Sequence, residues 1–195
     1  MSNRLARRTV VARLLEDRDN LLVVSGLGAP TYDCAAVGDH ALNFYLWGAM
    51  GQAAVIGLGL ATAQPKRPVL VITGDGEMLM GLGALATIAV RRPPNLAIVV
   101  LDNERYGETG NQSTHTADGV DLAGIAKAAG FAHTFRVEDE ATFATVLATL
   151  RAGKGPVFAA IKISDHQDPM VLPPRDGTLI KHRFRERLLG AAALK

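Results

Sequence analysis

The chain has little of several residue types, and each shortage argues against a class of protein. Its 195 residues include one cysteine, Cys34, so no disulfide can form within the chain, and a reducing compartment is favoured. The net charge is only +2, too small for a general nucleic-acid-binding surface. The longest apolar run, 53–63, is roughly half of the ~20 residues that a membrane span needs. We therefore expect a cytoplasmic protein that binds neither membranes nor nucleic acid.

Aliphatic residues and glycine are plentiful instead. Hydrophobic residues make up 48% of the chain, aromatics only 5%, and glycine occurs 20 times, which is typical of parallel α/β proteins with aliphatic buried strands. The length suits one domain with a sizeable core. Apolar strand-like runs alternate with helix-like segments, which predicts a doubly wound, mostly parallel sheet with right-handed crossovers and helices on both faces.

Periodicity and breaker residues predict where these elements lie. Close packing of the second helix is expected at Gly57 and Gly59, and Asp121 and Gly130 are predicted to cap a later helix. From Ser164 the chain becomes proline-rich and then basic, which predicts an irregular segment followed by a short basic helix. Strands are predicted at 21–26, 44–48, 69–73, 96–101 and 156–163, and helices at 5–15, 50–63, 78–90, 122–130, 139–150 and 181–195.

Two predicted strands end in polar residues that suit a metal-bound phosphate. Gly74-Asp75-Gly76 follows one strand and Asp102-Asn103 follows the next. The carboxyl ends of neighbouring parallel strands share one edge of the sheet, where ligands bind. The glycines allow close backbone approach, and the start of the next helix offers N–H groups to phosphate. Because Mg²⁺ prefers oxygen ligands, Asp75, Asn103 and a backbone carbonyl beyond it predict a metal-bridged diphosphate.

Gly74-Asp75-Gly76, separated from Asp102-Asn103 by 25 residues, resembles the fingerprint of thiamine diphosphate (ThDP) enzymes, which commonly have Asn-Asn as the second element. The resemblance covers residues 5–163 and is to the pyrophosphate-binding domain of that superfamily. The stretches LDNERYGETGNQSTHT and FYLWGAMG most resemble the phosphonopyruvate and sulfopyruvate decarboxylases. The implied organisation is a thiamin diphosphate-binding fold over 1–165, followed by a proline-rich segment and basic C-terminal helix at 166–195.

The resemblance also implies roles for individual residues. Asp75 and Asn103 become side-chain metal ligands, and the Arg105 carbonyl becomes the backbone ligand. The Gly48 carbonyl would accept a hydrogen bond from the aminopyrimidine, and Met50 would fill the wedge beneath the bent cofactor, for which a thioether is suited. Gly76 and Glu77 would lie against the diphosphate. The remaining cofactor-binding residues are Gly28, Thr31, Ala49, Gly74 and Tyr106, although the sequence Gly-Ala-Pro-Thr at 28–31 departs from the family pattern.

A partner is implied as well. ThDP enzymes of this kind activate the cofactor with a glutamate on a separate pyrimidine-binding domain, and residues 1–26 are too few to contain one. We therefore expect an α subunit that supplies this glutamate, with the cofactor bound across the interface of a homo- or hetero-oligomer. The expected function is the β subunit of a ThDP- and Mg²⁺-dependent 2-oxoacid decarboxylase acting on sulfopyruvate or phosphonopyruvate.

Other interpretations stay open. The chain could serve a ThDP-dependent carboligase or transferase, a non-catalytic subunit that retains the fold, or a phosphohydrolase that uses Asp75 directly. His115 is a catalytic candidate because histidine titrates near neutrality, but it is also explained as a surface-loop residue, as are Gln112 and Thr114. Met50 could be a core residue, Asp75 and Asn103 could be strand caps, and a solvated helix explains the basic residues at 181–185 more simply than substrate binding does.

Overall fold

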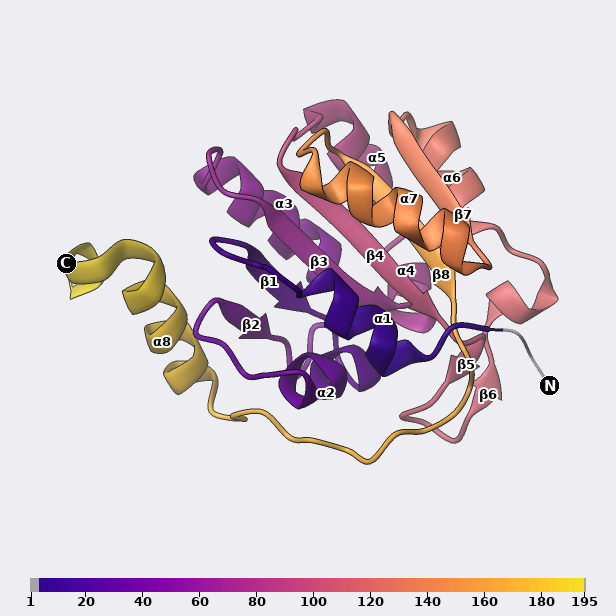
Figure 1. The fold of residues 1–195 in the computed structure, drawn as a ribbon, viewed down its shortest axis with the longest axis horizontal. Coiled ribbons are helices and arrows are strands. Elements are labelled where there is room, and N and C mark those ends of the chain that lie inside the picture. The colour runs from indigo at the N-terminus through magenta and orange to yellow at the C-terminus, as the bar shows by residue number, and fades with distance from the viewer. Residues whose placement is uncertain (1–3, 195) are drawn as a thin grey trace.

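A six-stranded parallel sheet forms the centre of the protein, as the computed structural model of residues 4–194 shows (Figure 1). The order across the sheet is β2-β1-β3-β4-β8-β7, and each neighbouring pair is parallel. The predicted parallel sheet is therefore confirmed. Its strands are β1 (Leu22–Ser25), β2 (Asn43–Tyr45), β3 (Val69–Gly74), β4 (Leu96–Asp102), β7 (His133–Val137) and β8 (Val157–Lys162).

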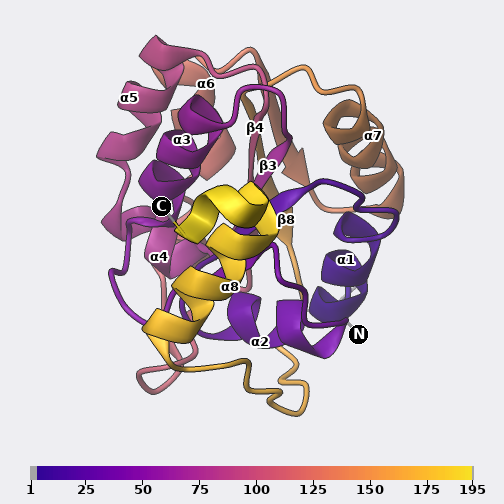
Figure 2. The same ribbon diagram turned by 90° about the vertical axis from the view of Figure 1, so that its left-hand side faces the viewer.

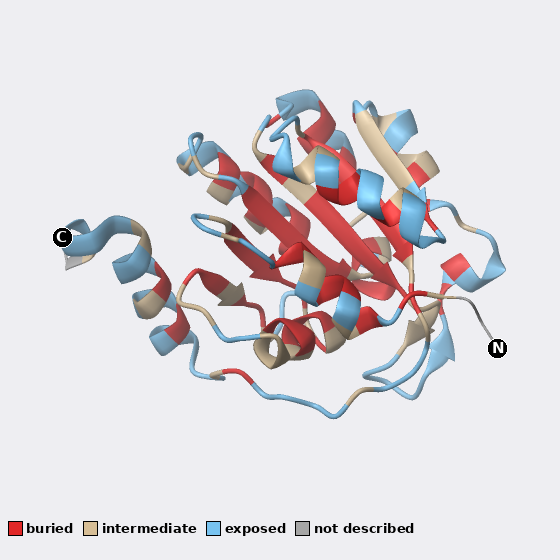
Figure 3. Ribbon diagram, in the orientation of Figure 1, coloured by how far each residue is buried: buried red, intermediate tan, exposed pale blue. Residues whose placement is uncertain are grey.

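Helices cover both faces of this sheet, which confirms the doubly wound architecture (Figures 1 and 2). Successive residues of a strand point to opposite faces, so Leu70 and Val71 enter different cores. The central strands are almost wholly buried (Figure 3). One face carries α1 (Arg7–Leu14), α2 (Ala29–Ala36) and α7 (Glu140–Arg151), and the other carries α3 (Ala53–Ala63), α5 (Gly83–Arg91) and α6 (Leu122–Ala129).

The predicted caps of α6 are confirmed. The Asp121 side chain accepts a hydrogen bond from the backbone N–H of Gly124 at 2.9 Å. Gly130 follows the last turn in the left-handed conformation, with φ of 111°, where glycine is favoured because it lacks a Cβ. Local capping chemistry was therefore sufficient to locate both ends of this helix.

The predicted helix 78–90 is wrong in its bounds, because two helices occupy this region. The first, α4 (Asp75–Met80), begins directly at the end of β3, and α5 follows after a break at Gly81-Leu82. A Cβ on Gly81 would overlap the carbonyl oxygen of Gly51. The break therefore lies where the chain passes against the loop that precedes α3, a contact that periodicity does not encode.

Helix α2, strand β7 and the hairpin of β5 (Arg105–Tyr106) and β6 (Gln112–Ser113) were not predicted. The buried face of α2 includes Asp33, which pairs with Arg7 and Arg8 of α1. This face therefore lacks the continuous apolar stripe by which an amphipathic helix is identified in a sequence. Strand β7 is an edge strand and mostly half-exposed.

Cys34, also on α2, is fully buried, and burial raises the pKa of its thiol to about 12, which supports a structural role.

The proline-rich segment runs from the end of β8, past α2, to the β2 edge, where α8 (Gly177–Leu189) begins (Figure 1). This helix starts before the predicted residue 181, because the Asp176 side chain caps it by accepting from the N–H groups of Thr178 and Leu179. Ile180 and Phe184 are buried against the sheet. A short 3-10 helix, η2 (Gly190–Leu194), follows.

None of the helices within residues 4–194 combines the length and apolar character needed to cross a membrane.

Close packing between α3 and the sheet depends on one of the two predicted glycines. A Cβ on Gly57 would overlap Cγ2 of Val71 on β3, whereas a Cβ on Gly59 would have no atom within 4 Å. The expectation is therefore confirmed for Gly57 and wrong for Gly59, which faces away from the sheet.

These neighbouring glycines give a matched test of the packing. Gly57→Ala should lower the free energy of unfolding by about 1–3 kcal/mol, because the added methyl group overpacks the contact with Val71. Gly59→Ala should raise it by roughly 0.5–1 kcal/mol, because alanine favours a helix and space is available. Urea unfolding measures both values, and effects of the same sign at the two positions would contradict the packing described.

Candidate cofactor site

The two polar motifs meet because their strands are neighbours. Gly74 of β3 pairs in register with Leu101 of β4, so Asp75 and Asp102 each follow the paired residues directly. Both carboxylates are buried, with 1% and 2% of their surface exposed. The predicted convergence of Asp75 and Asp102-Asn103 at one carboxyl edge is confirmed.

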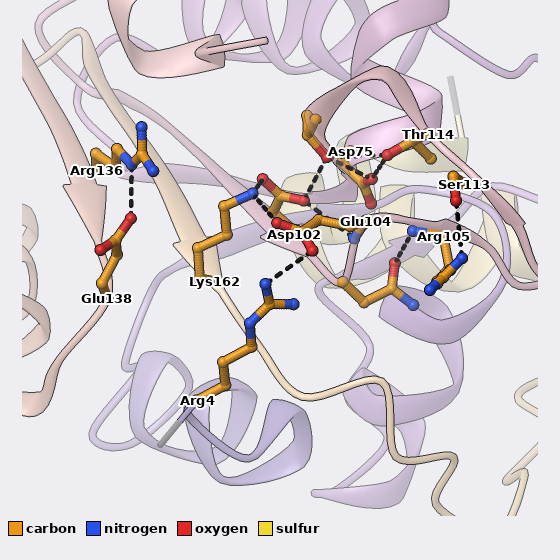
Figure 4. A network of polar contacts seen from close by, with 12 residues as sticks. Arg4, Asp75, Asp102, Glu104, Arg105, Ser113, Thr114, Arg136, Glu138 and Lys162 are labelled. Carbon is orange, nitrogen blue, oxygen red and sulfur yellow. Dashed lines mark hydrogen bonds and ion pairs between the residues drawn. The ribbon is translucent and has the colours of Figure 1, made fainter. Parts of the chain in front are cut away.

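Two threonines beyond β6 hold these carboxylates: Thr114, and Thr116 in the short 3-10 helix η1 (His115–Asp118). The Thr114 hydroxyl donates to Oδ2 of Asp75 (Figure 4), and the Thr116 hydroxyl donates to Oδ1 of Asp102 at 2.7 Å. Thr116 Oγ1 also lies 3.2 Å from Oδ2 of Asp75, so this one residue contacts the ends of both strands. His115, which lies between them in sequence, is exposed, and its proposed catalytic role stays a prediction.

Asp75 carries an uncompensated charge. Burial raises the pKa of its carboxyl group to about 6, and the nearby charge of Asp102 acts in the same direction, against the hydrogen bonds from Thr114 and Thr116. Within residues 4–194 Asp75 makes no ion pair. A buried carboxylate of this kind is stabilised by a bound cation, which supplies the missing opposite charge.

Asp102, in contrast, has a cationic partner from the next strand. Lys162, in register with Asp102, places Nζ 2.8 Å from Oδ2 of Asp102 and 2.7 Å from Oε1 of Glu104. Arg4 completes the network at 2.7 Å from Oε2 of Glu104 (Figure 4). Burial alone would lower the pKa of Lys162, but its two carboxylate partners outweigh this and raise it. The network fixes the loop that begins at Asn103.

That loop carries the proposed second and third metal ligands. Oδ1 of Asn103 accepts from the N–H of Arg105 at 3.1 Å, and an amide oxygen has a further lone pair for a cation. Glu104 between them has a φ of 63°, an unusual value for a residue other than glycine that often marks a functional site. The Arg105 side chain turns aside, donating to Ser113 Oγ at 2.8 Å, so its backbone carbonyl is the relevant group.

Gly76 and Tyr106 bring the two motifs into contact. A Cβ on Gly76 would lie 2.5 Å from Cε1 of the Tyr106 ring, so any larger residue would displace the ring. The glycine of the motif is therefore required for this close approach of the Tyr106 loop to the start of α4.

The Glu77 side chain points toward the end of β1. Its carboxylate lies over Gly26, where a Cβ would overlap Oε2, and it accepts from the Thr73 hydroxyl at 2.7 Å. Its other oxygen, Oε1, is buried without a hydrogen-bond partner. Burial raises the pKa of Glu77 more than the Thr73 hydroxyl and nearby backbone N–H groups lower it. Because a carboxylate and a diphosphate are both anionic, the predicted contact of Glu77 with a diphosphate would use its backbone N–H group.

The other proposed cofactor residues lie on two loops and in the first turn of α2. Gly48, Ala49 and Met50 are exposed between β2 and α3, and Ala49 has a φ of 55°, rare for alanine. Gly28, with a φ of 81°, lies against Glu108, but the Thr31 hydroxyl is buried and donates to the Gly26 carbonyl at 2.8 Å. Residues 28–31 would therefore contact a cofactor through their backbone and not through the Thr31 side chain.

The donor set fits one hard cation bound with a phosphate. Among residues 4–194 there is no cluster of three or more His, Cys, Asp or Glu side chains that would hold a metal. The predicted set consists of one carboxylate, one amide and one backbone carbonyl, which leaves coordination positions for phosphate oxygens and water. The uncompensated charge of Asp75 and the close approach at Gly76 are the structural observations that agree with it.

Sequence reasoning missed three residues of the site: Thr116, Lys162 and Glu104. Lys162 could have been found as a charged residue at the end of an otherwise apolar strand. A weaker signal was the sequence Ser113-Thr114-His115-Thr116. Its two threonines are buried, whereas the histidine between them is exposed. Nothing in the sequence indicated that Glu104 would join Lys162 and Arg4.

The chain belongs to the thiamine pyrophosphate enzyme family. Residues 26–161 match the model of the family's C-terminal TPP-binding domain, so the fold and the polar edge described above are those of a domain that binds thiamine diphosphate. The resemblance inferred from the sequence motifs is confirmed.

Relatives refine this assignment. The chain is 38% identical to sulfopyruvate decarboxylase subunit beta of Methanothermobacter thermautotrophicus, over 96% of this chain and 97% of that protein. It is 39% identical to phosphonopyruvate decarboxylase of Streptomyces viridochromogenes, but covers only 46% of that protein against 93% of its own length. Benzoylformate decarboxylase of Polynucleobacter necessarius has the same fold, with a TM-score of 0.69 at 20% identity, over 85% of this chain and 34% of that one.

The raised pKa of Asp75 predicts that its ionisation lowers the free energy of unfolding of the metal-free protein. Because the folded state holds this proton more tightly than the unfolded state, the stability it gives is complete below about pH 3.8 and is lost as the pH rises through about 6. Asp75→Asn removes the charge, so in EDTA it should be more stable than the parent by roughly 3 kcal/mol at pH 7. At pH 4 the difference should be small.

Denaturant unfolding at both pH values measures this effect. Asp118→Asn is the control, since Asp118 is exposed in the same loop and should show no comparable pH-dependent gain. A stability difference between Asp75→Asn and the parent that does not grow from pH 4 to pH 7 would contradict the electrostatics described.

Proposed function

We propose that this chain is the β subunit of a ThDP- and Mg²⁺-dependent 2-oxoacid decarboxylase that acts on sulfopyruvate or phosphonopyruvate. The observation that carries the proposal is the convergence of Asp75 with Asp102-Asn103 at one carboxyl edge, in a chain of the TPP-binding family. The relatives named sulfopyruvate decarboxylase subunit beta and phosphonopyruvate decarboxylase support this choice of reaction and substrate.

In this proposal Asp75, Asn103 and the Arg105 carbonyl hold Mg²⁺. The Gly74–Glu77 backbone, Gly28 and Tyr106 border the diphosphate, while Gly48, Ala49 and Met50 receive the aminopyrimidine. When bound, ThDP would supply a nucleophilic carbon and an electron sink for decarboxylation. Met50 would support the bound cofactor, and His115 is the candidate for proton transfer to or from the substrate.

The chain's own residues act by orientation and charge. Thr114 and Thr116 fix the Asp75 carboxylate before a cation arrives, so little rearrangement is required on binding. Lys162 balances Asp102 and Glu104, which leaves Asp75 as the carboxylate available to the metal. The buried position of these groups excludes water and strengthens their interaction with a cation.

A partner subunit completes the proposed enzyme. The word "subunit" in the name of the Methanothermobacter relative indicates that that protein works within an assembly. We infer an α subunit whose pyrimidine-binding domain provides the activating glutamate, and a cytoplasmic complex, in agreement with the single buried cysteine.

The proposal predicts the behaviour of Asp75→Ala in the complex. Calorimetric titration of ThDP with Mg²⁺ into the chain co-expressed with its α subunit should show binding, and the variant should bind at least about 100-fold more weakly, since even outer-shell changes cost 10–100-fold. Asp118→Ala, which alters an exposed acid in the same loop, should bind like the parent. CO₂ release from sulfopyruvate, phosphonopyruvate and pyruvate measures the reaction.

The outcomes separate the alternatives. ThDP binding with a condensed product in place of an aldehyde and CO₂ would favour a carboligase or transferase. A folded complex without ThDP binding would favour a non-catalytic subunit, and phosphate release without ThDP would indicate a phosphohydrolase. Each of these results would overturn the proposed decarboxylase.

A further inference from the structure

The proline-rich segment between β8 and α8 follows a defined path along the carboxyl edge of the sheet (Figure 1). Strand β8 ends beside β4 at that edge, and the segment then passes α2 to reach the β2 edge. Pro173 within it is buried, and proline fixes its own φ. Three hydrogen bonds tie the segment to the rest of the chain: the Ser164 N–H to the Leu5 carbonyl at 3.0 Å, the Arg8 guanidinium to the Pro169 carbonyl at 2.7 Å, and Trp47 Nε1 to the Pro174 carbonyl at 2.9 Å.

The last of these bonds places Arg175 next to the loop proposed to receive the aminopyrimidine. Arg175 follows Pro174 directly, and its guanidinium lies over the Trp47 ring, 5.3 Å from the ring centroid. Trp47 in turn precedes Gly48, the first residue of that loop. A guanidinium stacked on an indole keeps its N–H groups free for hydrogen bonds in its own plane. Arg175 therefore presents hydrogen-bond donors beside the proposed cofactor loop.

Tyr32 of α2 belongs to the same group of side chains. Its ring lies 6.2 Å from that of Trp47, centroid to centroid, and its hydroxyl donates to Oε2 of Glu108 at 3.3 Å. Burial and Glu108 raise the pKa of Tyr32, and the positive charge of Arg175 acts against them. Glu108 also lies against Gly28, which is proposed to border the diphosphate. Side chains from the proline-rich segment, α2 and the β5–β6 hairpin thus meet at one place on the cofactor edge.

The charge of Arg175 is not neutralised, in contrast to three other cations near this edge. Arg4, Arg8 and Lys162 each form an ion pair with a carboxylate, whereas Arg175 forms none within residues 4–194. The carboxylate of its neighbour Asp176 accepts from two N–H groups of α8. Arg175 is also exposed. A guanidinium that is held in place, accessible and unpaired is suited to bind an anionic group of a ligand.

We propose that Arg175 binds the sulfonate or phosphonate group of the substrate and thereby selects 2-oxoacids that carry a second anion. This inference rests on the proposed function and adds to it a residue that determines specificity. Sulfopyruvate and phosphonopyruvate each have a carboxylate that leaves as CO₂ and a second anionic group that stays. A cation on the departing carboxylate would stabilise the bound substrate more than the transition state and would oppose the reaction. The guanidinium is therefore assigned to the group that stays, whose oxygens can accept two parallel N–H donors.

Arg175→Gln tests the assignment, because it removes the charge from an exposed side chain and should leave the fold intact. In the complex with the α subunit this variant should raise KM for sulfopyruvate and phosphonopyruvate at least about tenfold, since charge-assisted hydrogen bonds are the strong ones. The kcat value should change less than about threefold, because an interaction made equally with bound substrate and transition state affects binding alone. Turnover of pyruvate, which lacks the second anion, should not change.

Two further variants accompany it. Arg187→Gln is the matched control, since Arg187 is also an exposed arginine without an ion pair in the described part of the chain but lies in the last turn of α8. It should behave like the parent with every substrate. Arg175→Lys should lie between the parent and Arg175→Gln, because an ammonium group keeps the charge but cannot make the bidentate contact. Unfolding curves show that each variant is folded.

Binding of an unreactive probe separates this inference from the proposed function. The probe is 3-sulfopropanoate, which has the sulfonate and carboxylate of sulfopyruvate but no 2-oxo group, and butanoate is the comparison without a sulfonate. Calorimetric titration into the complex with ThDP should show that 3-sulfopropanoate binds, and that Arg175→Gln weakens its binding at least about tenfold without affecting butanoate.

The outcomes are distinct. Failure of the parent complex to bind 3-sulfopropanoate would overturn the proposal, as would unchanged affinity and KM in Arg175→Gln. An equal loss for pyruvate and butanoate would also overturn it, because the residue would then act on the fold or the cofactor and not on the second anion. Binding of 3-sulfopropanoate through Arg175 in a complex that releases no CO₂ from any 2-oxoacid would refute the proposed function and not the sulfonate site.

Discussion

Two buried carboxylates at the ends of adjacent strands set the architecture of the carboxyl edge. Asp75 and Asp102 lie close enough for one threonine, Thr116, to contact both, and each would be costly to bury without compensation. Lys162 compensates Asp102, whereas Asp75 has hydroxyl donors but no ion pair within residues 4–194. This difference in charge compensation leaves Asp75 as the carboxylate to which we assign the proposed cation.

The surrounding structure follows from that arrangement. Gly76 must lack a side chain so that Tyr106 can lie against the motif, and Glu104 adopts an unfavourable backbone conformation while its side chain joins Lys162 and Arg4. Strain of this kind persists only where the neighbouring contacts determine the position. The loop that carries Asn103 and the Arg105 carbonyl is therefore fixed before any ligand binds.

Local sequence signals predicted much of the fold and half of this site. The aliphatic runs that became β3 and β4, the caps of α6 and the two polar motifs are each visible within a few residues, so they could be identified directly. Thr116 was missed because its partners are 41 and 14 residues away, and α2 because its buried face holds an ion pair with α1. The break between α4 and α5 depends on contact with Gly51, which periodicity cannot indicate.

The position of the metal is the most direct test of the proposed cofactor site. We would crystallise the complex with ThDP and Mn²⁺ in place of Mg²⁺ and locate the ion by its anomalous scattering. We expect one peak within about 2.2 Å of an Asp75 carboxylate oxygen, Oδ1 of Asn103 and the carbonyl oxygen of Arg105. A peak bound by other residues, or ThDP bound with no metal at Asp75, would contradict it.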